Sequence, residues 1–468
     1  MDIHKLNQNR FFQFMISRKI IIIAYLIILY LIFSTYFSSH FYFHTQINGV
    51  NLSLKAYEDA VNIIENHLKN YELQLFERYN ETEFITGQEI DLRYNERNSI
   101  DDIYKQQKSI PWIVSLFKDQ SYYLADLYTF HNDKLDDIMN ELLCINREIL
   151  APRNVSFYYS AGAYKLSAEV YGNKVIKAKL REAIKQSIIS GETSLDLSEH
   201  NCYEDPEYTL SSSKTSRTVK LLNKYIATKV TYRFGKHEER LSGNQIQKWL
   251  YVDNKLDVII NKDEVMKYIA ELSEKYDTVG ITRQFHASTG KIVEVKGGLY
   301  GWKIYQEGET KALIDTIKHG EIIEKEPIYI QRALSREGNE IGNTYVEINI
   351  TKQYLWFYKN GKLIAQGAVV TGNPNRGNAT VVGAYMLNYK QDGATLKGLG
   401  YEVDVNYWMP FFGNMGIHDA RWRSSFGGEI YKSRGTHGCV NAPYYLAKKI
   451  YENIEVGIPI IIYEEKSN

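Results

Sequence analysis

The stretch VEINITKQYLWFYKNGKLIAQGAVV, residues 346–370, decides how the C-terminal quarter of this 468-residue chain begins to fold. Apolar and polar residues alternate over residues 346–350, as they do in a strand with one buried face. Residues 353–358 form a second run rich in aromatic residues, and the Asn-Gly pair at 360–361 is typical of a tight hairpin turn. Residues 363–370 supply a third strand. The stretch therefore predicts an antiparallel β meander that opens a domain.

Reactive side chains follow this meander. They are His418 and, after seventeen intervening residues, the run Thr436-His437-Gly438-Cys439. A cysteine is a nucleophile only as its thiolate, so it needs a base or a positive field nearby. A histidine close in space can take that proton and return it to a leaving amine. Glycine before the cysteine leaves the backbone amides open toward a developing oxyanion. These residue types fit acyl transfer through a thioester.

The complete pattern, His-x17-Thr-His-Gly-Cys-Val-Asn, resembles the signature of the L,D-transpeptidase catalytic domain family. The flanking residues 416–422 and 441–462 are also similar to that family. The resemblance covers roughly residues 345–463 of the printed sequence. It departs from the family pattern at Val381, where proline is usual, and this makes the loop there less predictable.

The resemblance implies a mainly β catalytic domain, sandwich-like with a mixed sheet, at residues 345–464. It implies that Cys439 is the acylated nucleophile and His418 its general base, oriented by the backbone carbonyl of Asp419. His437 would line the site, and the Gly438 and Cys439 amides would form the oxyanion hole. Further candidates for substrate contact are Asn441, Tyr401, Trp408, Trp422 and Arg434. Each of these aromatic residues could instead belong to the core, and Arg434, like Arg421, could be a solvated charge.

The chemistry of the family implies attack of Cys439 on the peptide bond before the terminal D-Ala of a tetrapeptide stem. D-Ala leaves, and a side-chain amine of a neighbouring stem resolves the thioester into a 3→3 cross-link of peptidoglycan. Water as the acceptor would instead make the enzyme an L,D-carboxypeptidase, and the sequence leaves that alternative open. No cofactor or metal is expected, and carbapenem-type β-lactams are expected to acylate the cysteine.

Three other interpretations fit the pattern less well. A zinc site built from His418, His437 and Cys439 lacks a fourth ligand at a familiar spacing, and His-Gly-Cys is cramped for two ligands. A sortase would carry a Thr-Leu-x-Thr-Cys strand, which the sequence lacks. A non-catalytic wall-binding protein with a vestigial domain would not need every expected catalytic residue type, and all of them are present.

An internal repeat fills the middle of the chain. Residues 170–175, VYGNKV, match residues 299–304, LYGWKI, at a spacing of 129. Residues 85–90 match residues 241–246 at a spacing of 156. The difference, 156 − 129 = 27, predicts extra residues in the first copy, between about 91 and 131.

We therefore expect two α+β domains, residues 47–209 and 222–335, joined by a Ser-rich linker at 211–217. The opening of the first, residues 47–54, resembles the start of peptidoglycan-binding domains in cell-wall proteins. That resemblance implies wall binding by both copies. The alternative is that they only space the C-terminal domain from a membrane.

The N-terminus predicts a membrane anchor. Residues 20–37 carry no charge, and 18 residues of helix span about 27 Å, close to the roughly 30 Å of a bilayer core. Basic residues precede this run, and none follows before Lys55. The positive-inside rule then places residues 1–19 in the cytoplasm and the remainder outside. Because no small-x-small cleavage site follows, we expect a retained single-pass anchor in the cell membrane rather than a cleaved signal.

The amino-acid composition excludes two further classes of protein. Lys+Arg and Asp+Glu both number 56, so the chain lacks the basic surplus that nucleic-acid binding requires. Three cysteines are too few for a disulfide scaffold. Cys144 and Cys202 could pair outside the cell, although two separately buried thiols are favoured.

Overall fold

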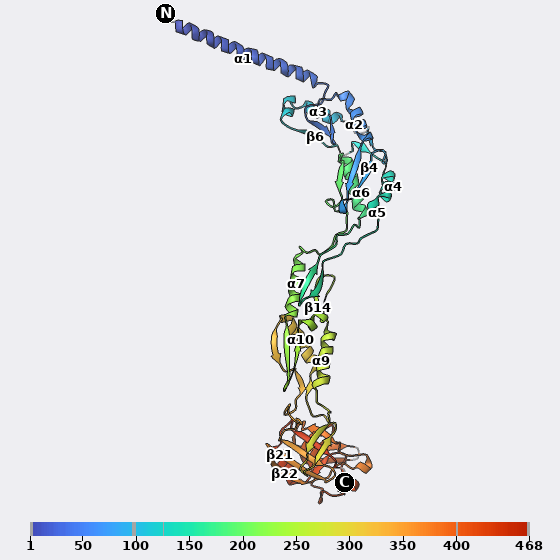
Figure 1. The fold of residues 1–468 in the computed structure, drawn as a ribbon, viewed down its shortest axis with the longest axis vertical. Helices are drawn as coiled ribbons and strands as arrows, with labels where there is room; N and C mark the ends of the chain where they lie inside the picture. Colours follow the sequence, from blue (N-terminus) through green and yellow to red (C-terminus); the bar gives the residue numbers. More distant parts are fainter. Residues whose placement is uncertain (1–2, 96–99, 125, 399–400, 466–468) are drawn as a thin grey trace. The chain divides into compact units, whose positions relative to one another are not determined.

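The computed structural model describes residues 3–95, 100–124, 126–398 and 401–465, with the side chains of residues 3–17 and of Tyr401 left undescribed. The chain divides into two compact units (Figure 1). The first comprises Met1–Ser156 and Leu166–Ser212. The second comprises Phe157–Lys165 and Ser213–Asn468.

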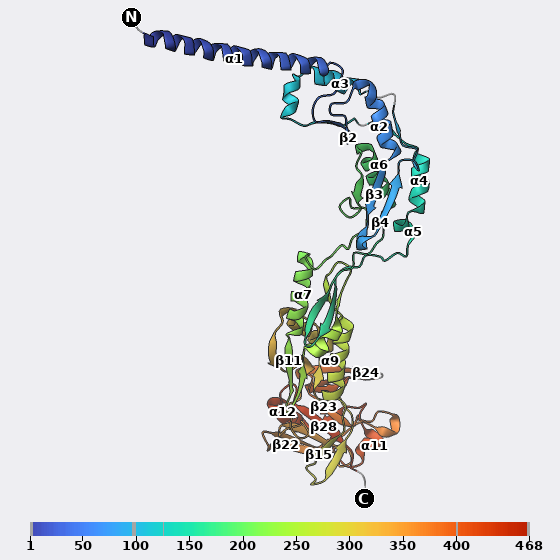
Figure 2. The ribbon, with the colours of Figure 1, turned by 45° about the horizontal axis from the view of Figure 1, so that its top comes forward.

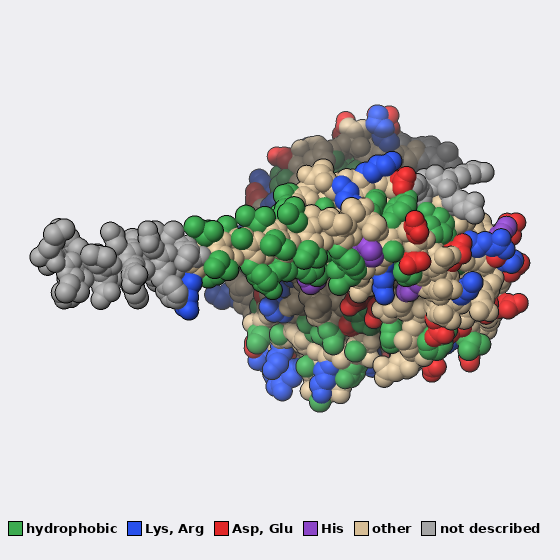
Figure 3. Space-filling view, turned by 90° about the horizontal axis from the view of Figure 1, so that it is seen from above, with side chains coloured by type: hydrophobic (Ala, Val, Ile, Leu, Met, Phe, Trp, Pro, Cys, Tyr) green, Lys and Arg blue, Asp and Glu red, His purple; other side chains and the backbone are tan. Residues whose placement is uncertain are grey.

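The first unit begins with helix α1 (Ile3–Tyr36). Its segment Arg18–Tyr36 has a mean hydropathy of 2.1, and none of it is buried inside the protein. Among the described residues it is the helix long and apolar enough to cross a membrane. Figure 3 shows hydrophobic side chains gathered around this part of the helix.

A three-stranded sheet forms the centre of the first unit, in the order β10-β3-β4. Strand β3 pairs antiparallel with β4 and parallel with β10. Alternate residues of β3 face inward, and Leu73 and Leu75 are fully buried against the two helices α2 and α6. The bounds are β3 (Glu72–Phe76), β4 (Thr82–Thr86), β10 (Ser194–Asp196), α2 (Ala60–Lys69) and α6 (Lys177–Ser190).

The second unit contains a sheet of the same pairing, in the order β12-β11-β18. Strand β11 pairs antiparallel with β12 and parallel with β18. Val230 and Tyr232 of β11 face a core that includes Leu222 of α7 and Leu313 of α10. The bounds are β11 (Lys229–Phe234), β12 (His237–Leu241), β18 (Ile322–Lys325), α7 (Ser213–Ile226), α9 (Lys262–Tyr276) and α10 (Gln306–His319).

The helices and hairpins around the two sheets also occupy corresponding positions in the sequence. Helices α6 and α10 each have 14 residues and are offset by 129 positions. Each ends at a glycine in the left-handed conformation, Gly191 with φ 76° and Gly320 with φ 71°. The hairpin β8–β9 (Ser156–Ser160, Ala163–Ser167) likewise corresponds to β15–β16 (Arg283–His286, Ile292–Val295). These correspondences favour a duplication, and the proposed domain boundaries stay a prediction.

The extra residues that the sequence predicts in the first copy lie in the connection between strands β5 and β7. Strands β13 (Leu250–Val252) and β14 (Val258–Ile260) pair across residues 253–257, whereas β5 (Arg93–Tyr94) and β7 (Tyr128–Thr129) pair across residues 95–127. The described part of that long connection forms α3 (Asp101–Lys108), η3 (Trp112–Leu116) and β6 (Gln120–Tyr122). Strand β6 pairs in parallel with β1 (Thr45–Ile47), soon after α1 ends.

The C-terminal part is a mainly β domain, as the family resemblance implies, and it is built from two mixed sheets. One has the order β22-β21-β20-β28-β23 and the other β24-β25-β26-β27. Figure 2 shows helix α12 (Tyr444–Asn453) beside the first sheet, and its Leu446 and Ile450 share one core with both sheets. The strands are β20 (Tyr345–Asn349), β21 (Tyr354–Lys359), β22 (Lys362–Ala368), β23 (Gly383–Met386), β24 (Gln391–Gly398), β25 (Tyr401–Phe412), β26 (Met415–Asp419), β27 (Val440–Ala442) and β28 (Pro459–Tyr463).

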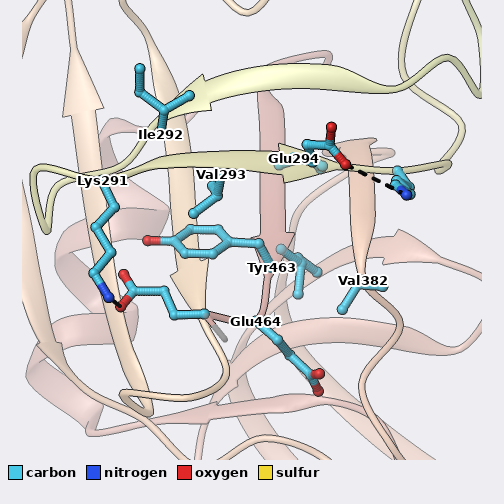
Figure 4. A pocket seen from close by; sticks show the side chains of 11 residues that line it. Lys291, Ile292, Val293, Glu294, Val382, Tyr463 and Glu464 are labelled. Atoms are coloured by element: carbon cyan, nitrogen blue, oxygen red, sulfur yellow. Dashed lines mark ion pairs between the residues drawn. The ribbon is translucent and has the colours of Figure 1, made fainter. Parts of the chain in front are cut away.

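The hairpin β15–β16 docks on the first of these sheets. Ser288, at its turn, donates from its amide (2.9 Å) and hydroxyl (2.5 Å) to the buried carboxylate of Glu347. Thr289 donates to Glu465 at 2.5 Å, and Asn349 donates to the same carboxylate at 3.0 Å. A cavity of about 570 Å³ lies beside the hairpin, rimmed by Lys291, Glu294 and Tyr463 among others (Figure 4). Because buried carboxylates are costly unless hydrogen-bonded, these contacts bind the hairpin to the domain.

The corresponding hairpin β8–β9 also packs within the second unit. Tyr159 donates to Asn244 at 2.6 Å, and the Tyr164 hydroxyl donates to the Gln247 carbonyl at 3.1 Å. The Tyr164 amide donates to Asn223 of α7 at 2.9 Å. Residues 157–165 therefore belong to the second unit, although they lie within the range 47–209 expected for the first repeat domain.

Candidate active site

Two neighbouring parallel strands bring His418 and Cys439 to one face of the smaller sheet. In the pairing of β26 with β27, Ile417 lies opposite Val440 and His418 opposite Asn441. Side chains alternate between faces along a strand, so Ile417 and Val440 face the core and His418 and Asn441 face away from it. Cys439 directly precedes β27, and its place in that alternation puts it on the face of Asn441.

His418 is held in one orientation and one tautomer. Its Nδ1 lies 2.9 Å from the backbone carbonyl oxygen of Asp419. A carbonyl oxygen only accepts, so Nδ1 carries the hydrogen and Nε2 keeps its lone pair. The ring is 3% exposed and lies between Trp408 and Trp422, at centroid distances of 5.9 and 6.0 Å. Burial lowers the pKa of His418, so the imidazole is neutral at neutral pH.

The carboxylate of Asp419 has a separate structural role. It is buried, and one oxygen accepts from the amides of Asn406 and Tyr407 at 2.8 and 2.9 Å. The other lies 3.8 Å from Nε of Arg421. The side chain of Asp419 therefore ties β26 to β25, while its backbone orients His418.

Cys439 is a half-buried thiol. Its Sγ donates to the carbonyl of Asn414 at 3.5 Å. Burial raises the pKa of Cys439 to about 11, and a hydrogen bond from the Gly416 backbone opposes that rise. The resting pair is therefore a protonated thiol and a neutral imidazole, the combination that general-base activation requires.

The loop that carries Cys439 is fixed from within and from outside. Thr436 donates to the Cys439 carbonyl at 2.6 Å and accepts from the Gly438 amide at 3.1 Å. Thr380, which is buried, donates to the Gly438 carbonyl and accepts from the Gly372 amide, both at 2.8 Å. The Gly438 amide, expected to be an oxyanion donor, is thus occupied by Thr436 in this structure.

Gly438 has a different and specific reason to be glycine. Its φ is +114°, in the region that side chains rarely adopt. A Cβ at this position would lie 2.7 Å from Cε of Met415. The turn before Cys439 therefore requires a residue without a side chain.

A cavity of about 310 Å³ opens over these residues. The predicted site residues His418, Trp422, His437 and Cys439 line it, and so does the neighbouring Thr436. Asn441 also lines it, and its buried Oδ1 has no hydrogen-bond partner among the described residues. Leu396 and Val403, from the hairpin β24–β25, close the apolar side.

The remaining predicted contacts lie elsewhere. Trp408 is buried opposite His418 on the neighbouring strand β25 and donates to the hydroxyl of Tyr389 at 3.2 Å. Arg434 ends helix α11 (Ile430–Arg434) and is absent from the residues that line the cavity. Arg421 lies over the ring of Tyr444, 4.2 Å from its centroid. Tyr401 begins β25, and its side chain lies outside the described part of the chain.

Arg423 is a cavity residue that the sequence does not single out. It lines the cavity, and its buried Nε has no hydrogen-bond partner among the described residues. Burial lowers the pKa of Arg423, and the charge of Arg434 lowers it further. A half-buried guanidinium that makes no ion pair with the described residues is suited to a carboxylate ligand. The neighbouring Arg421 looks equivalent in the sequence. The turn after β26 places Arg423 at the cavity and Arg421 over the ring of Tyr444.

The other two cysteines lie in the first unit and are free thiols, as is Cys439. Both are buried, and burial raises the pKa of Cys202 to about 11 and that of Cys144 beyond its usual range. Because both thiols are buried and protonated, we expect Cys144 and Cys202 to be unreactive core residues.

Two family models match the chain. Residues 343–462 match the L,D-transpeptidase catalytic domain. Residues 208–322 match a peptidoglycan-binding domain. No curated protein matches the chain.

Solved structures are also similar to parts of this chain. A mutant of the Enterococcus faecium L,D-transpeptidase is 31% identical, with 53% of this chain and all of that chain covered and a TM-score of 0.43. The avibactam carbamoyl enzyme of Ldtfm is 30% identical, with 54% of this chain and all of that one covered and a TM-score of 0.44. The E. faecium catalytic domain acylated by ertapenem is 37% identical, covering 26% of this chain and 97% of its own, with a TM-score of 0.24.

Proposed function

The chain belongs to the L,D-transpeptidase family, and we propose that it joins peptidoglycan stems by 3→3 cross-links through a Cys439 thioester. The observation that carries the proposal is the cavity that His418 and Cys439 both line, with Nδ1 of His418 held by a backbone carbonyl. That arrangement leaves Nε2 as the acceptor for a thiol proton.

The proposed reaction has two halves. His418 takes the proton of Cys439 as sulfur attacks the carbonyl before the terminal D-Ala, and it returns the proton to the departing amine. A side-chain amine of a second stem then attacks the thioester and loses a proton to His418, which returns that proton to the sulfur of Cys439 as the C–S bond breaks. The Cys439 amide is the proposed oxyanion donor, because Thr436 already occupies the Gly438 amide. His437 and Trp422 would contact the donor stem.

We propose that Arg423 receives a carboxylate of the donor stem, with Arg434 strengthening the positive field. The unpartnered Oδ1 of Asn441 would accept from a substrate amide in the same cavity. These two groups supply an anion site and an acceptor in the cavity that Cys439 lines, which suits a peptide with a free carboxylate.

We further propose that α1 anchors the protein in the cell membrane, with residues 1–19 in the cytoplasm and the catalytic domain at the wall. The length and hydropathy of Arg18–Tyr36 and the basic residues before it support this topology. Cleavage as a signal peptide is the alternative. The match of residues 208–322 supports wall binding by the second copy, and the corresponding elements extend that proposal to the first.

Inhibition by β-lactams follows from the same thiol. One related structure is a catalytic domain acylated by ertapenem, and another is an avibactam carbamoyl enzyme. We expect carbapenem-type β-lactams to acylate Cys439 here.

The test is to incubate the full chain, in detergent, with a disaccharide-tetrapeptide and to follow the products by mass spectrometry. Cross-linked dimers lacking one D-Ala are the expected result. Tripeptide monomers alone would indicate an L,D-carboxypeptidase. Absence of turnover and of acyl adducts, with sacculi still pelleting the protein, would indicate a wall-binding protein.

A matched pair of variants tests the site. Cys439→Ala should abolish both turnover and acylation. Cys202→Ala, which removes a thiol buried in the first unit, should leave both unchanged. Turnover that survives Cys439→Ala would overturn the assignment of the nucleophile.

A further inference from the structure

An apolar segment of the first unit, residues 110–117, is exposed beside the end of α1. Ile110, Ile113, Val114 and Leu116 are all exposed, and Phe117 is 88% exposed. Isolated exposed apolar residues are ordinary, but five within eight positions form a patch of the kind that marks an interaction surface. In Figures 1 and 2 this segment lies next to the C-terminal part of α1.

One residue of the segment faces the other way and fastens it to the helix. The ring of Trp112 lies 5.5 Å from that of Tyr30 and 5.2 Å from that of Phe33, and its Nε1 donates to Ser34 at 3.0 Å. Trp112 also joins Phe37 and Tyr42 in a small buried aromatic core. The segment is therefore attached to the apolar helix itself.

The level of that contact along the helix is decisive. Tyr30 and Phe33 both lie inside the apolar stretch Arg18–Tyr36. Tyr30 precedes Tyr36 by six residues, or about 9 Å along the axis at 1.5 Å per residue. A bilayer that surrounds Arg18–Tyr36 must therefore also reach the segment that packs at the level of Tyr30.

The join between α1 and the folded unit leaves little freedom to move the segment away. Tyr36 donates to the carbonyl of Leu54 at 3.0 Å, and Tyr104 donates to that of Ser38 at 2.7 Å. The Tyr42 hydroxyl donates to the carbonyl of Ile110 at 3.1 Å, at the start of the segment. Strand β6, just after it, pairs with β1.

We propose that residues 110–117 insert into the outer leaflet of the bilayer as an interfacial wedge, so that the first unit is seated on the membrane and not merely tethered to it. The occupant of this apolar surface is the lipid that surrounds α1. Aromatic and aliphatic side chains at the headgroup level are the usual means of such docking. The proposal rests on the proposed anchoring by α1.

The experiment places a fluorophore on the wedge in the full chain. Cys439→Ala removes the half-buried thiol, and Cys144 and Cys202 are buried, so an introduced cysteine takes the label selectively. Phe117→Cys, and independently Leu116→Cys, is labelled with the fluorophore NBD. The protein is reconstituted in vesicles of phosphatidylethanolamine and phosphatidylglycerol. Quenching is measured with aqueous iodide and with lipids that carry a nitroxide near the headgroup.

Two control positions separate this proposal from the anchor on which it rests. Phe84→Cys, on the exposed face of β4, reports a site in water. Ile28→Cys reports α1 itself. We expect the labels at 116 and 117 to be quenched by the nitroxide lipid and protected from iodide several-fold relative to the label at 84.

Iodide quenching at 116 and 117 equal to that at 84, with lipid quenching at 28, would overturn the wedge and leave the anchor intact. Lipid quenching absent at 28 would overturn the anchor and the wedge together.

Discussion

At the scale of single residues, the protonation state of Cys439, the proposed nucleophile, has the clearest consequence. Burial raises the pKa of Cys439 to about 11 and lowers that of His418, so the folded site holds a neutral pair. In the proposed mechanism, catalysis then depends on a proton transfer that occurs as the substrate reacts, and not on a thiolate already present. This distinguishes the site from cysteine enzymes that keep a thiolate–imidazolium pair.

The pH dependence of alkylation measures this directly. The thiolate fraction of Cys439 rises only as the pH approaches about 11, so iodoacetamide should react slowly at neutral pH and faster throughout the alkaline range. Mass spectrometry of the Cys439 peptide gives the rate, and the buried Cys202 serves as an internal reference. A plateau already reached at neutral pH would contradict the neutral pair.

The rate of acylation by ertapenem should show the acid side of the pH profile. His418 acts as a base only when unprotonated, so the rate should fall as the pH drops through a pKa lying below 6.5, the ordinary value for histidine. The loss is expected on the acid side because the folded-state pKa is lowered. A midpoint above the ordinary value would contradict the geometry of a buried, neutral ring.

Arg423 provides a test of substrate recognition. A charge-assisted hydrogen bond contributes about 1.5–3 kcal/mol, so Arg423→Ala should lower kcat/KM for the tetrapeptide by roughly 10- to 100-fold. Arg421→Ala, in the adjacent arginine that lies over Tyr444, is the matched control and should have a much smaller effect. Equal losses in both variants would indicate a general charge effect and no carboxylate contact.

The sequence predicted the residues of the signature because one contiguous run carries their chemistry. Cys439, His437 and Asn441 lie together in the chain and line one cavity. Arg423, Leu396 and Val403 could not be predicted in this way. These three residues line the cavity because tertiary packing brings a turn and the hairpin β24–β25 to it, and no local pattern in the sequence indicates that packing.

At the scale of elements, the loop before β23 supports the loop of the nucleophile. Thr380 sits beside Val381, the position at which the sequence departs from the family pattern. Its hydroxyl still links the Gly372 amide to the Gly438 carbonyl. The departure therefore leaves this support in place.

Removing that hydroxyl should loosen the catalytic loop. Thr380→Val keeps the shape but leaves two buried backbone groups unpaired, at about 1–3 kcal/mol each. We expect a lower Tm and slower acylation by ertapenem, whereas Thr380→Ser should retain both. Unchanged acylation and Tm in Thr380→Val would show that Thr380 does not support the loop.

The alternation of the strands and the Asn-Gly turn predicted the meander, and Asn360 and Gly361 both adopt the left-handed conformation there. The docking of β15–β16 was beyond such reasoning. Its partners Glu347 and Glu465 read as ordinary charges in the sequence, and they become buried acceptors only when the hairpin covers them.

At the scale of the molecule, the two units have separate cores and should unfold separately. Leu73→Ala in the first unit and Leu355→Ala in the second each delete buried side chains, at about 2–5 kcal/mol. In detergent, calorimetry should show two transitions, each variant lowering one. Leu222→Ala, in the second copy, should lower the transition that also abolishes acylation, because that copy and the catalytic domain share one unit.

A third transition, with acylation insensitive to Leu222→Ala, would contradict this division. The sequence predicted the repeat from matching segments such as residues 170–175 and 299–304. It did not predict the division into two units, because hairpins far apart in the sequence decide it.

Those hairpins have a consequence for how such proteins are assembled over evolutionary time. β8–β9 and β15–β16 occupy corresponding positions, and each packs on the module that follows in the chain. A repeat that contains the hairpin by which it packs on the next domain can be duplicated in a gene without new contacts having to evolve. The catalytic domain can then be supplied with a longer or shorter series of repeats while its own mounting stays the same.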